Sequence, residues 1–183
     1  MDSDAIADSD LVVRETALPA RNEARFSDRL RKTLGLSVSM MMLDGDAARE
    51  LATRPKLTGA ALALAFLGTL GANFPFVHSA GQLVVAGLGF FAFIVPMMAV
   101  QHLVARALGG KATYPQFVRT MYATNAMYVT GFIPVVGAPL VGLAVIWDCV
   151  VTTRALAAIT GLSIPRAMAA FIAVTLPLLL LAL

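Results

Sequence analysis

The sequence predicts an all-α, polytopic membrane protein with five transmembrane helices, a cytoplasmic N-terminus and a C-terminus outside. Three observations lead to this fold class. First, 58% of the 183 residues are hydrophobic and 14% are charged, whereas soluble domains average about 45–50% and about 25%. Second, the apolar residues form long segments that proline and glycine residues separate. Third, all Lys and Arg residues fall on one side of the membrane when these segments are counted as spans.

The chain divides into a polar part, residues 1–56, and an apolar part, residues 57–183. Residues 1–20 contain few large apolar side chains and are predicted to be a mobile polar tail. Residues 21–56 are predicted to form cytoplasmic or interfacial amphipathic helices. The five-span transmembrane domain is predicted to occupy residues 57–183.

The first amphipathic helix is predicted around Phe26, Leu30 and Leu34, which recur every four residues with charged residues between them. Such a helix can lie in the membrane interface, with its apolar side in the lipid and its basic side at the headgroups. It can also pack on the cytoplasmic face of the protein's own bundle, and the sequence leaves both interpretations open. A second, short helix is predicted to begin at the Asp44 cap and to end near Thr53.

Five apolar segments are long enough to be helical spans, because about 20 residues cross a hydrocarbon core of about 30 Å. Proline or glycine residues stand at their ends or in the turns between them. The third segment is the least apolar of the five. The predicted spans are residues 57–74, 80–105, 116–133, a fourth from the 134–139 reversal to about 159, and 164–183.

The fourteen Lys and Arg residues predict the orientation of these spans. Nine lie in residues 1–56, three in the 106–119 connection and two in the 154–166 connection. Five spans place these three segments on the same side of the membrane. The 75–79 and 134–137 connections, on the other side, contain none. Because positive residues accumulate on the cytoplasmic side, the N-terminus is predicted to be cytoplasmic.

The first span has small residues on one face, at Ala61, Ala65, Gly68 and Ala72. Small residues mark helix contacts in lipid, because association there depends on close packing rather than on a hydrophobic driving force. We expect this face to pack within the protein's own bundle, with contact to a second copy of the chain as the alternative.

Asp148 is the only acidic residue after residue 50, and it falls inside the fourth span. His102 lies one turn inside Arg106, and Asn125 lies six residues inside Arg119. We therefore predict an intramembrane polar layer of His102, Asn125 and Asp148, closed by Arg106 and Arg119. This layer can be a proton or ion relay or a small ligand site. It can equally be a polar cluster that only fixes which helices pack together.

Sequence motifs of catalysis and of metal binding are not found in the chain. A His-Glu-x-x-His run, a Gly-x-Ser-x-Gly elbow and a phosphate-binding loop all fail to occur. The single cysteine, Cys149, excludes an internal disulfide and a cysteine-rich metal site. We expect a protein without enzymatic activity, cofactor or metal. Membrane topology accounts for its basic residues, so nucleic-acid binding is not expected.

Short motifs follow one another in a defined order along the apolar part. They are Gly109-Gly110-Lys111-Ala112-Thr113-Tyr114-Pro115-Gln116, Met121-Tyr122-Ala123-Thr124, Ile146-Trp147, Ala158-Ile159-Thr160-Gly161-Leu162-Ser163 and Arg166-Ala167. With the helix predicted over 44–55, they make residues 44–183 resemble the Yip domain of the Ypt/Rab-interacting membrane protein family, in its prokaryotic-type branch. The resemblance implies five spans, a cytoplasmic N-terminus and no enzymatic activity. Eukaryotic members of that family bind Rab GTPases and each other.

These observations predict a non-catalytic, multi-pass protein of the bacterial inner membrane that acts as a scaffold or shapes the bilayer. Its expected partners are the lipid bilayer, proteins in the membrane or cytoplasm, and a second copy of the chain. Two other functions stay open. One is a small transporter, or a proton- or ion-conducting subunit, that uses Asp148 and His102. The other is an accessory subunit of a larger membrane complex.

Overall fold

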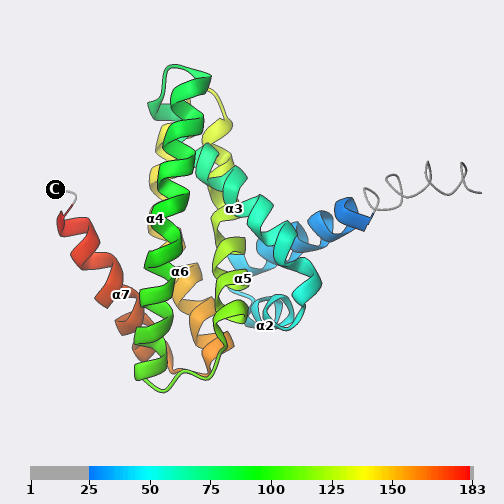
Figure 1. Cartoon of the computed structure of the whole chain (residues 1–183), viewed down its shortest axis with the longest axis vertical. Helices are drawn as coiled ribbons and strands as arrows, with labels where there is room; N and C mark the ends of the chain where they lie inside the picture. The colour runs from blue at the N-terminus through cyan, green and yellow to red at the C-terminus, as the bar shows by residue number, and fades with distance from the viewer. Residues whose placement is uncertain (1–24, 182–183) are drawn as a thin grey trace, which may run out of the picture.

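The computed structural model describes residues 25–181, and the burial of side chains up to residue 177. Every regular element in this part of the chain is a helix (Figure 1). The predicted polar tail, residues 1–20, lies outside the described residues. In chain order the elements are a helix over 25–41, here called the N-terminal helix, then α2 (Gly45–Thr53), the 3-10 helix η1 (Pro55–Leu57), α3 (Thr58–Asn73), η2 (Phe74–Phe76), α4 (Ala80–Ala107), α5 (Tyr114–Thr124), η3 (Asn125–Phe132), α6 (Gly137–Thr160) and α7 (Ile164–Leu181).

Three of the described helical segments are long and apolar enough to cross a membrane, namely Pro55–Phe76, Ala80–Ala107 and Gly137–Thr160. A shorter apolar stretch, Ile164–Pro177, belongs to α7. The predicted all-helical class is confirmed for the described residues, together with several helices that are long and apolar enough to span a membrane. The number of five spans and the orientation of the termini stay predictions.

The segment predicted as the third span is not one continuous α-helix. It begins as α5, and from Asn125 it continues as the 3-10 helix η3. A 3-10 helix is narrower than an α-helix, and runs longer than 3–4 residues are uncommon. In this eight-residue run, the Thr130 hydroxyl donates to the carbonyl of Met127, three residues earlier, at 2.9 Å.

The backbones of α3 and η3 touch at three glycines. A Cβ atom on Gly68 would lie 1.9 Å from the carbonyl oxygen of Asn125, and one on Gly71 would lie 2.3 Å from that of Tyr128. From the other side, a Cβ on Gly131 would lie 1.9 Å from the oxygen of Gly71. Close approach of this kind maximises van der Waals contact where lipid provides no hydrophobic force. The packing of α3 therefore requires glycine at these positions.

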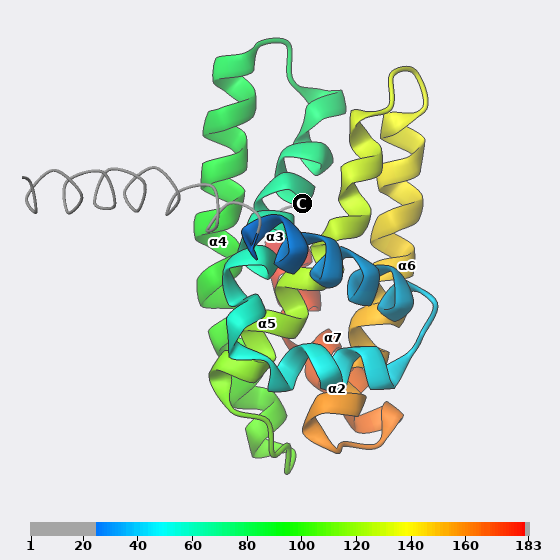
Figure 2. The ribbon, with the colours of Figure 1, turned by 90° about the vertical axis from the view of Figure 1, so that its right-hand side faces the viewer.

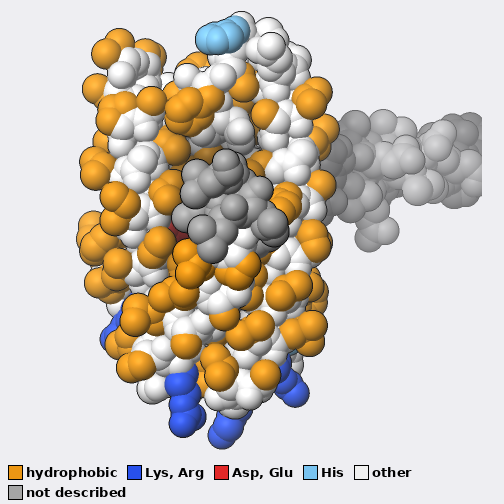
Figure 3. Space-filling view, turned by 90° about the vertical axis from the view of Figure 1, so that its left-hand side faces the viewer, with side chains coloured by type: hydrophobic (Ala, Val, Ile, Leu, Met, Phe, Trp, Pro, Cys, Tyr) orange, Lys and Arg blue, Asp and Glu red, His pale blue; other side chains and the backbone are white. Residues whose placement is uncertain are grey.

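The turns between α4 and α5 and between α6 and α7 lie against each other at one end of the bundle. The Lys111 amide donates to the carbonyl of Thr160 at 2.9 Å, which joins the two turns directly. Gly161 ends α6 with a φ of +73°, a conformation that favours glycine. Lys and Arg side chains gather at this end, and apolar side chains cover the flank above it (Figure 3). We call it the basic end.

The N-terminal helix and α2 run across the long helices rather than along them (Figure 2). Asp44 caps α2 by accepting hydrogen bonds from the amides of Asp46, at 2.8 Å, and Ala47, at 3.3 Å. The predicted short helix and its cap are thus confirmed. Leu51 of α2 is fully buried together with Phe117 of α5 and Leu156 of α6. The core of the described chain therefore extends from the crossing helices into the bundle.

Candidate functional site

The N-terminal helix packs on the bundle through small polar side chains. Thr33 and Ser37 are fully buried, and Met40 is almost so. A buried hydroxyl is costly unless it is hydrogen-bonded. Each of these hydroxyls donates to a carbonyl four residues earlier, at 2.8 Å: Thr33 to Arg29 and Ser37 to Thr33. The small side chains thus allow close contact and leave no hydroxyl without a partner.

The predicted apolar stripe of this helix lies beside the packed face. Leu30 is half-buried, whereas Phe26 and Leu34 are each 46% exposed. Val38, at 45%, and Met42, at 78%, extend the exposed apolar side. The helix therefore packs on the bundle and also presents an apolar side outward. The sequence left open whether this helix lies in the membrane interface or packs on the bundle. The structure is compatible with both.

Two side-chain contacts connect the N-terminal helix with other elements. Lys32 forms an ion pair with Glu50 of α2, with 3.1 Å between Nζ and Oε1. The indole of Trp147, on α6, donates to the carbonyl of Met41 at 3.0 Å. Lys32 lies about 200° around the helix from Leu34 at about 100° per residue. The basic side of the helix thus faces α2, and the apolar side faces away from it.

Asp148 and Asn125, two members of the predicted polar layer, line the same small cavity of about 50 Å³. The hydroxyl of Thr152, one turn along α6, donates to the Asp148 carboxylate at 3.0 Å. Thr124 also lines the cavity, and its hydroxyl donates to the carbonyl of Met121 at 2.8 Å. Sequence reasoning missed these hydroxyls, although the i, i+4 spacing of Asp148 and Thr152 was a usable signal. The cavity is lined by Ile94, Met97, Met98, Gln101, Met121, Thr124, Asn125, Asp148, Thr152 and Phe171.

The structure does not bring the other three members to this cavity. The imidazole of His102 packs against the rings of Tyr114 and Phe117, with 5.4 Å between ring centroids in each pair. Its Nδ1 atom is buried without a hydrogen-bond partner among the described residues. Arg106 is exposed. The single layer closed by two arginines is thus corrected: Asp148 and Asn125 line one cavity, and His102, Arg106 and Arg119 do not line it.

Arg119 connects α5 to the C-terminal end of α2. Its guanidinium donates to the hydroxyl of Thr58 at 2.9 Å, to the carbonyl of Leu51 at 3.3 Å and to the carbonyl of Ala52. The last carbonyls of a helix have no partner within the helix, and basic side chains bind them favourably. Six residues correspond to about 240° around a helix. Arg119 therefore points away from the side on which Asn125 lies.

The small residues predicted on the first span face the protein's own interior. Ala61, Ala65 and Gly68 are buried, and Ala72 is half-buried. Cys149, by contrast, is a free and exposed thiol on α6. Within residues 25–181, no three His, Cys, Asp or Glu side chains gather as metal ligands would.

No protein-family model, curated protein or solved structure matches this chain. The resemblance to the Yip family therefore stays a prediction from short motifs.

Proposed function

We propose that this chain is a non-catalytic integral membrane protein that organises the bilayer from its cytoplasmic side. In this proposal it resembles the Yip family, crosses the bacterial inner membrane five times and recruits protein partners at its basic end. The single observation that carries the proposal is the way in which the N-terminal helix lies on the bundle. The helix lies across the bundle, presents Leu34 and Val38 outward on one side and pairs Lys32 with α2 on the other.

The lengths of the helices support five crossings. The eleven residues of α5 and the eight of η3 together extend about 32 Å, at about 1.5 and about 2.0 Å per residue. The eighteen residues of α7 extend about 27 Å. Both lengths are close to the hydrocarbon thickness of about 30 Å. The basic residues at one end support placing that end in the cytoplasm.

The position of the N-terminal helix suggests how it acts on lipid. A helix with one apolar and one basic side binds in the interfacial plane, with the apolar side entering the acyl-chain boundary. Here the bundle fixes the helix at a set angle through Thr33, Ser37 and Met40. A helix held in this way adds area to one leaflet only. That difference in area favours curvature towards the cytoplasmic side.

The test is reconstitution of the full-length protein into vesicles at increasing protein-to-lipid ratio, with vesicle diameter measured by electron cryomicroscopy. We expect the diameter to fall as the ratio of protein to lipid rises. The double variant Leu34→Gln with Val38→Gln should abolish the effect, because its apolar side can no longer enter the lipid. The matched control, Leu34→Met with Val38→Ile, keeps the side apolar and should behave as wild type. Equal diameters for the polar variant and wild type would contradict the proposal.

A second candidate function is proton or ion conduction through the Asp148 cavity. It is favoured by the five polar side chains that line this small space, which are Gln101, Thr124, Asn125, Asp148 and Thr152. Proton flux into proteoliposomes carrying a pH-sensitive dye tests it. Conduction predicts a flux that Asp148→Asn abolishes. Flux equal to that of protein-free vesicles would remove this candidate.

A further inference from the structure

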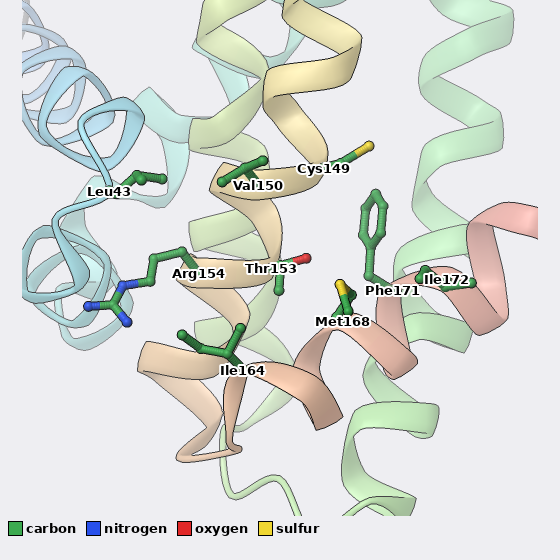
Figure 4. A pocket seen from close by; sticks show the side chains of 9 residues that line it. All are labelled: Leu43, Cys149, Val150, Thr153, Arg154, Ile164, Met168, Phe171 and Ile172. Atoms are coloured by element: carbon green, nitrogen blue, oxygen red, sulfur yellow. The ribbon is translucent and has the colours of Figure 1, made fainter.

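A groove on the outside of the bundle runs between α6 and α7, with a volume of about 640 Å³. Its walls come from three elements, as Figure 4 shows: α6, α7 and the turn after the N-terminal helix, which contributes Leu43. Sites for small organic ligands commonly have volumes of about 300–1,000 Å³. The groove is lined by Leu43, Cys149, Val150, Thr153, Arg154, Ile164, Met168, Phe171 and Ile172, so Arg154 is its charged residue.

A second, polar pocket of about 470 Å³ adjoins this groove. The two share three lining residues, Leu43, Arg154 and Ile164. In Figure 4 the side chain of Arg154 extends away from Met168 and Phe171, towards the crossing helices. An apolar compartment thus continues into a charged one, with Arg154 at their junction. The polar pocket is lined by Leu43, Asp44, Gly45, Asp46, Arg49, Arg154, Ala157, Ala158, Leu162, Ser163 and Ile164.

The charges in the polar pocket are only partly paired. Arg49 forms an ion pair with Asp46. The Asp44 carboxylate accepts two backbone amides as the cap of α2, and no cationic side chain of residues 25–177 pairs with it. Arg154 makes no side-chain hydrogen bond or ion pair within the same residues. Among the described residues, the Arg154 guanidinium and the Asp44 carboxylate of this pocket therefore have no oppositely charged partner. A zwitterionic headgroup carries the two charges that would pair with them.

The position of the groove identifies the source of its ligand. α6 is long and apolar enough to cross a membrane, and the first part of α7 is apolar as well. The polar pocket lies at the α6–α7 turn, on the basic end, and the apolar groove extends from it along both helices. A phospholipid in a bilayer has its polar and apolar parts in the same order, because its headgroup lies at the interface and its acyl chains extend inward. A soluble ligand would need a route through lipid to reach the apolar part.

We propose that this composite groove binds one amine-bearing phospholipid from the leaflet at the basic end. One acyl chain lies between α6 and α7, against Met168 and Phe171. The phosphate pairs with the guanidinium of Arg154, since guanidinium and phosphate form charge-assisted, bidentate hydrogen bonds. The ammonium lies beside Asp44. This binding is independent of any effect of the N-terminal helix on membrane curvature.

The first test is native mass spectrometry of the full-length protein, delipidated in micelles and titrated with three lipids of identical acyl chains. The lipids are phosphatidylethanolamine, phosphatidylglycerol and diacylglycerol. We expect one phosphatidylethanolamine per chain, bound several-fold more tightly than phosphatidylglycerol, and diacylglycerol bound weakest. Equal binding of diacylglycerol and phosphatidylethanolamine would overturn the phosphate site. Equal binding of phosphatidylglycerol would overturn the ammonium site.

Two variants test the two charged contacts separately. Arg154→Gln should weaken phosphatidylethanolamine binding by about tenfold or more, the effect of losing a charged hydrogen bond. Arg166→Gln is its matched control, because Arg166 is an exposed cation near the same turn that does not line either pocket. Asp44→Asn keeps a good N-cap while removing the charge, so it should equalise the two phospholipids. Equal affinities for Arg154→Gln and Arg166→Gln would overturn the proposal.

Discussion

Replacing Gly68 by alanine is expected to push α3 and η3 apart. The new Cβ atom would lie 1.9 Å from the carbonyl oxygen of Asn125, whereas such contacts essentially never fall below 3.0 Å. The two backbones must therefore separate by more than 1 Å. The rigid oxygen belongs to the main chain, so no side-chain rotation can relieve the clash. Overpacking of this kind costs about 1–3 kcal/mol, and sometimes more.

The same helix offers a matched control at Gly59. A Cβ atom at this position of α3 would meet nothing within 4 Å. Both substitutions replace glycine by alanine within α3 (Thr58–Asn73), and alanine has the higher helix propensity, by up to about 1 kcal/mol. Gly59→Ala should thus be neutral or slightly stabilising. The difference between the two variants isolates the contact with η3, because the gain in propensity cancels, and it should reach about 1–3 kcal/mol.

The assay is equilibrium unfolding in mixed micelles with increasing dodecyl sulfate, with helix content followed by circular dichroism. Gly68→Ala should unfold at a lower mole fraction of dodecyl sulfate than wild type, and Gly59→Ala at the same or a higher one. Equal midpoints for the two variants would refute the close contact between α3 and η3.

Two further substitutions test how the crossing helices are held. Arg119→Met keeps much of the side-chain volume but removes the contacts with α2, and it should cost about 2–4 kcal/mol in the same unfolding assay. Arg106→Met, at an exposed arginine, is the control and should change the unfolding midpoint little. An equal loss of stability in Arg119→Met and Arg106→Met would contradict the role of Arg119 in holding α2. Trp147→Phe keeps an aromatic ring without its N–H donor to Met41. Loss of this hydrogen bond removes about 0.5–1.5 kcal/mol of stabilisation, so amide hydrogen exchange in the N-terminal helix should accelerate about two- to tenfold. An unchanged exchange rate would show that the hydrogen bond does not stabilise this helix.

Apart from the third predicted span, the ends of the apolar helices that the structure describes were predictable from the sequence to about two residues. Residues 80–105 were predicted for the helix that the structure has as α4, Ala80–Ala107, and α7 begins at the predicted residue, Ile164. Both begin next to a serine and are bounded by glycine or proline turns. Such signals depend on neighbours in the chain, so they need no knowledge of the packing.

The candidate site was predictable only in part. The depth of Asp148 and Asn125 follows from counting residues along each span, and both line one cavity. The same count placed His102 and Arg119 near the depth of the predicted polar layer. Depth along a helix does not specify the direction in which a side chain points. Arg119 turns towards α2, and His102 towards Tyr114 and Phe117. The relative rotation of the helices decided which side chains meet.

Composition and segment length by themselves determined an all-helical fold with several helices that are long and apolar enough to cross a membrane. These quantities belong to contiguous stretches of chain, and the transfer of such a stretch into lipid depends on little else. Only the tertiary structure decided that η3 is a 3-10 helix against α3, that the N-terminal helix packs through Thr33 and Ser37, and that Arg154 joins an apolar groove to a charged pocket. Each of these depends on the distance between segments far apart in the chain, which no local pattern specifies.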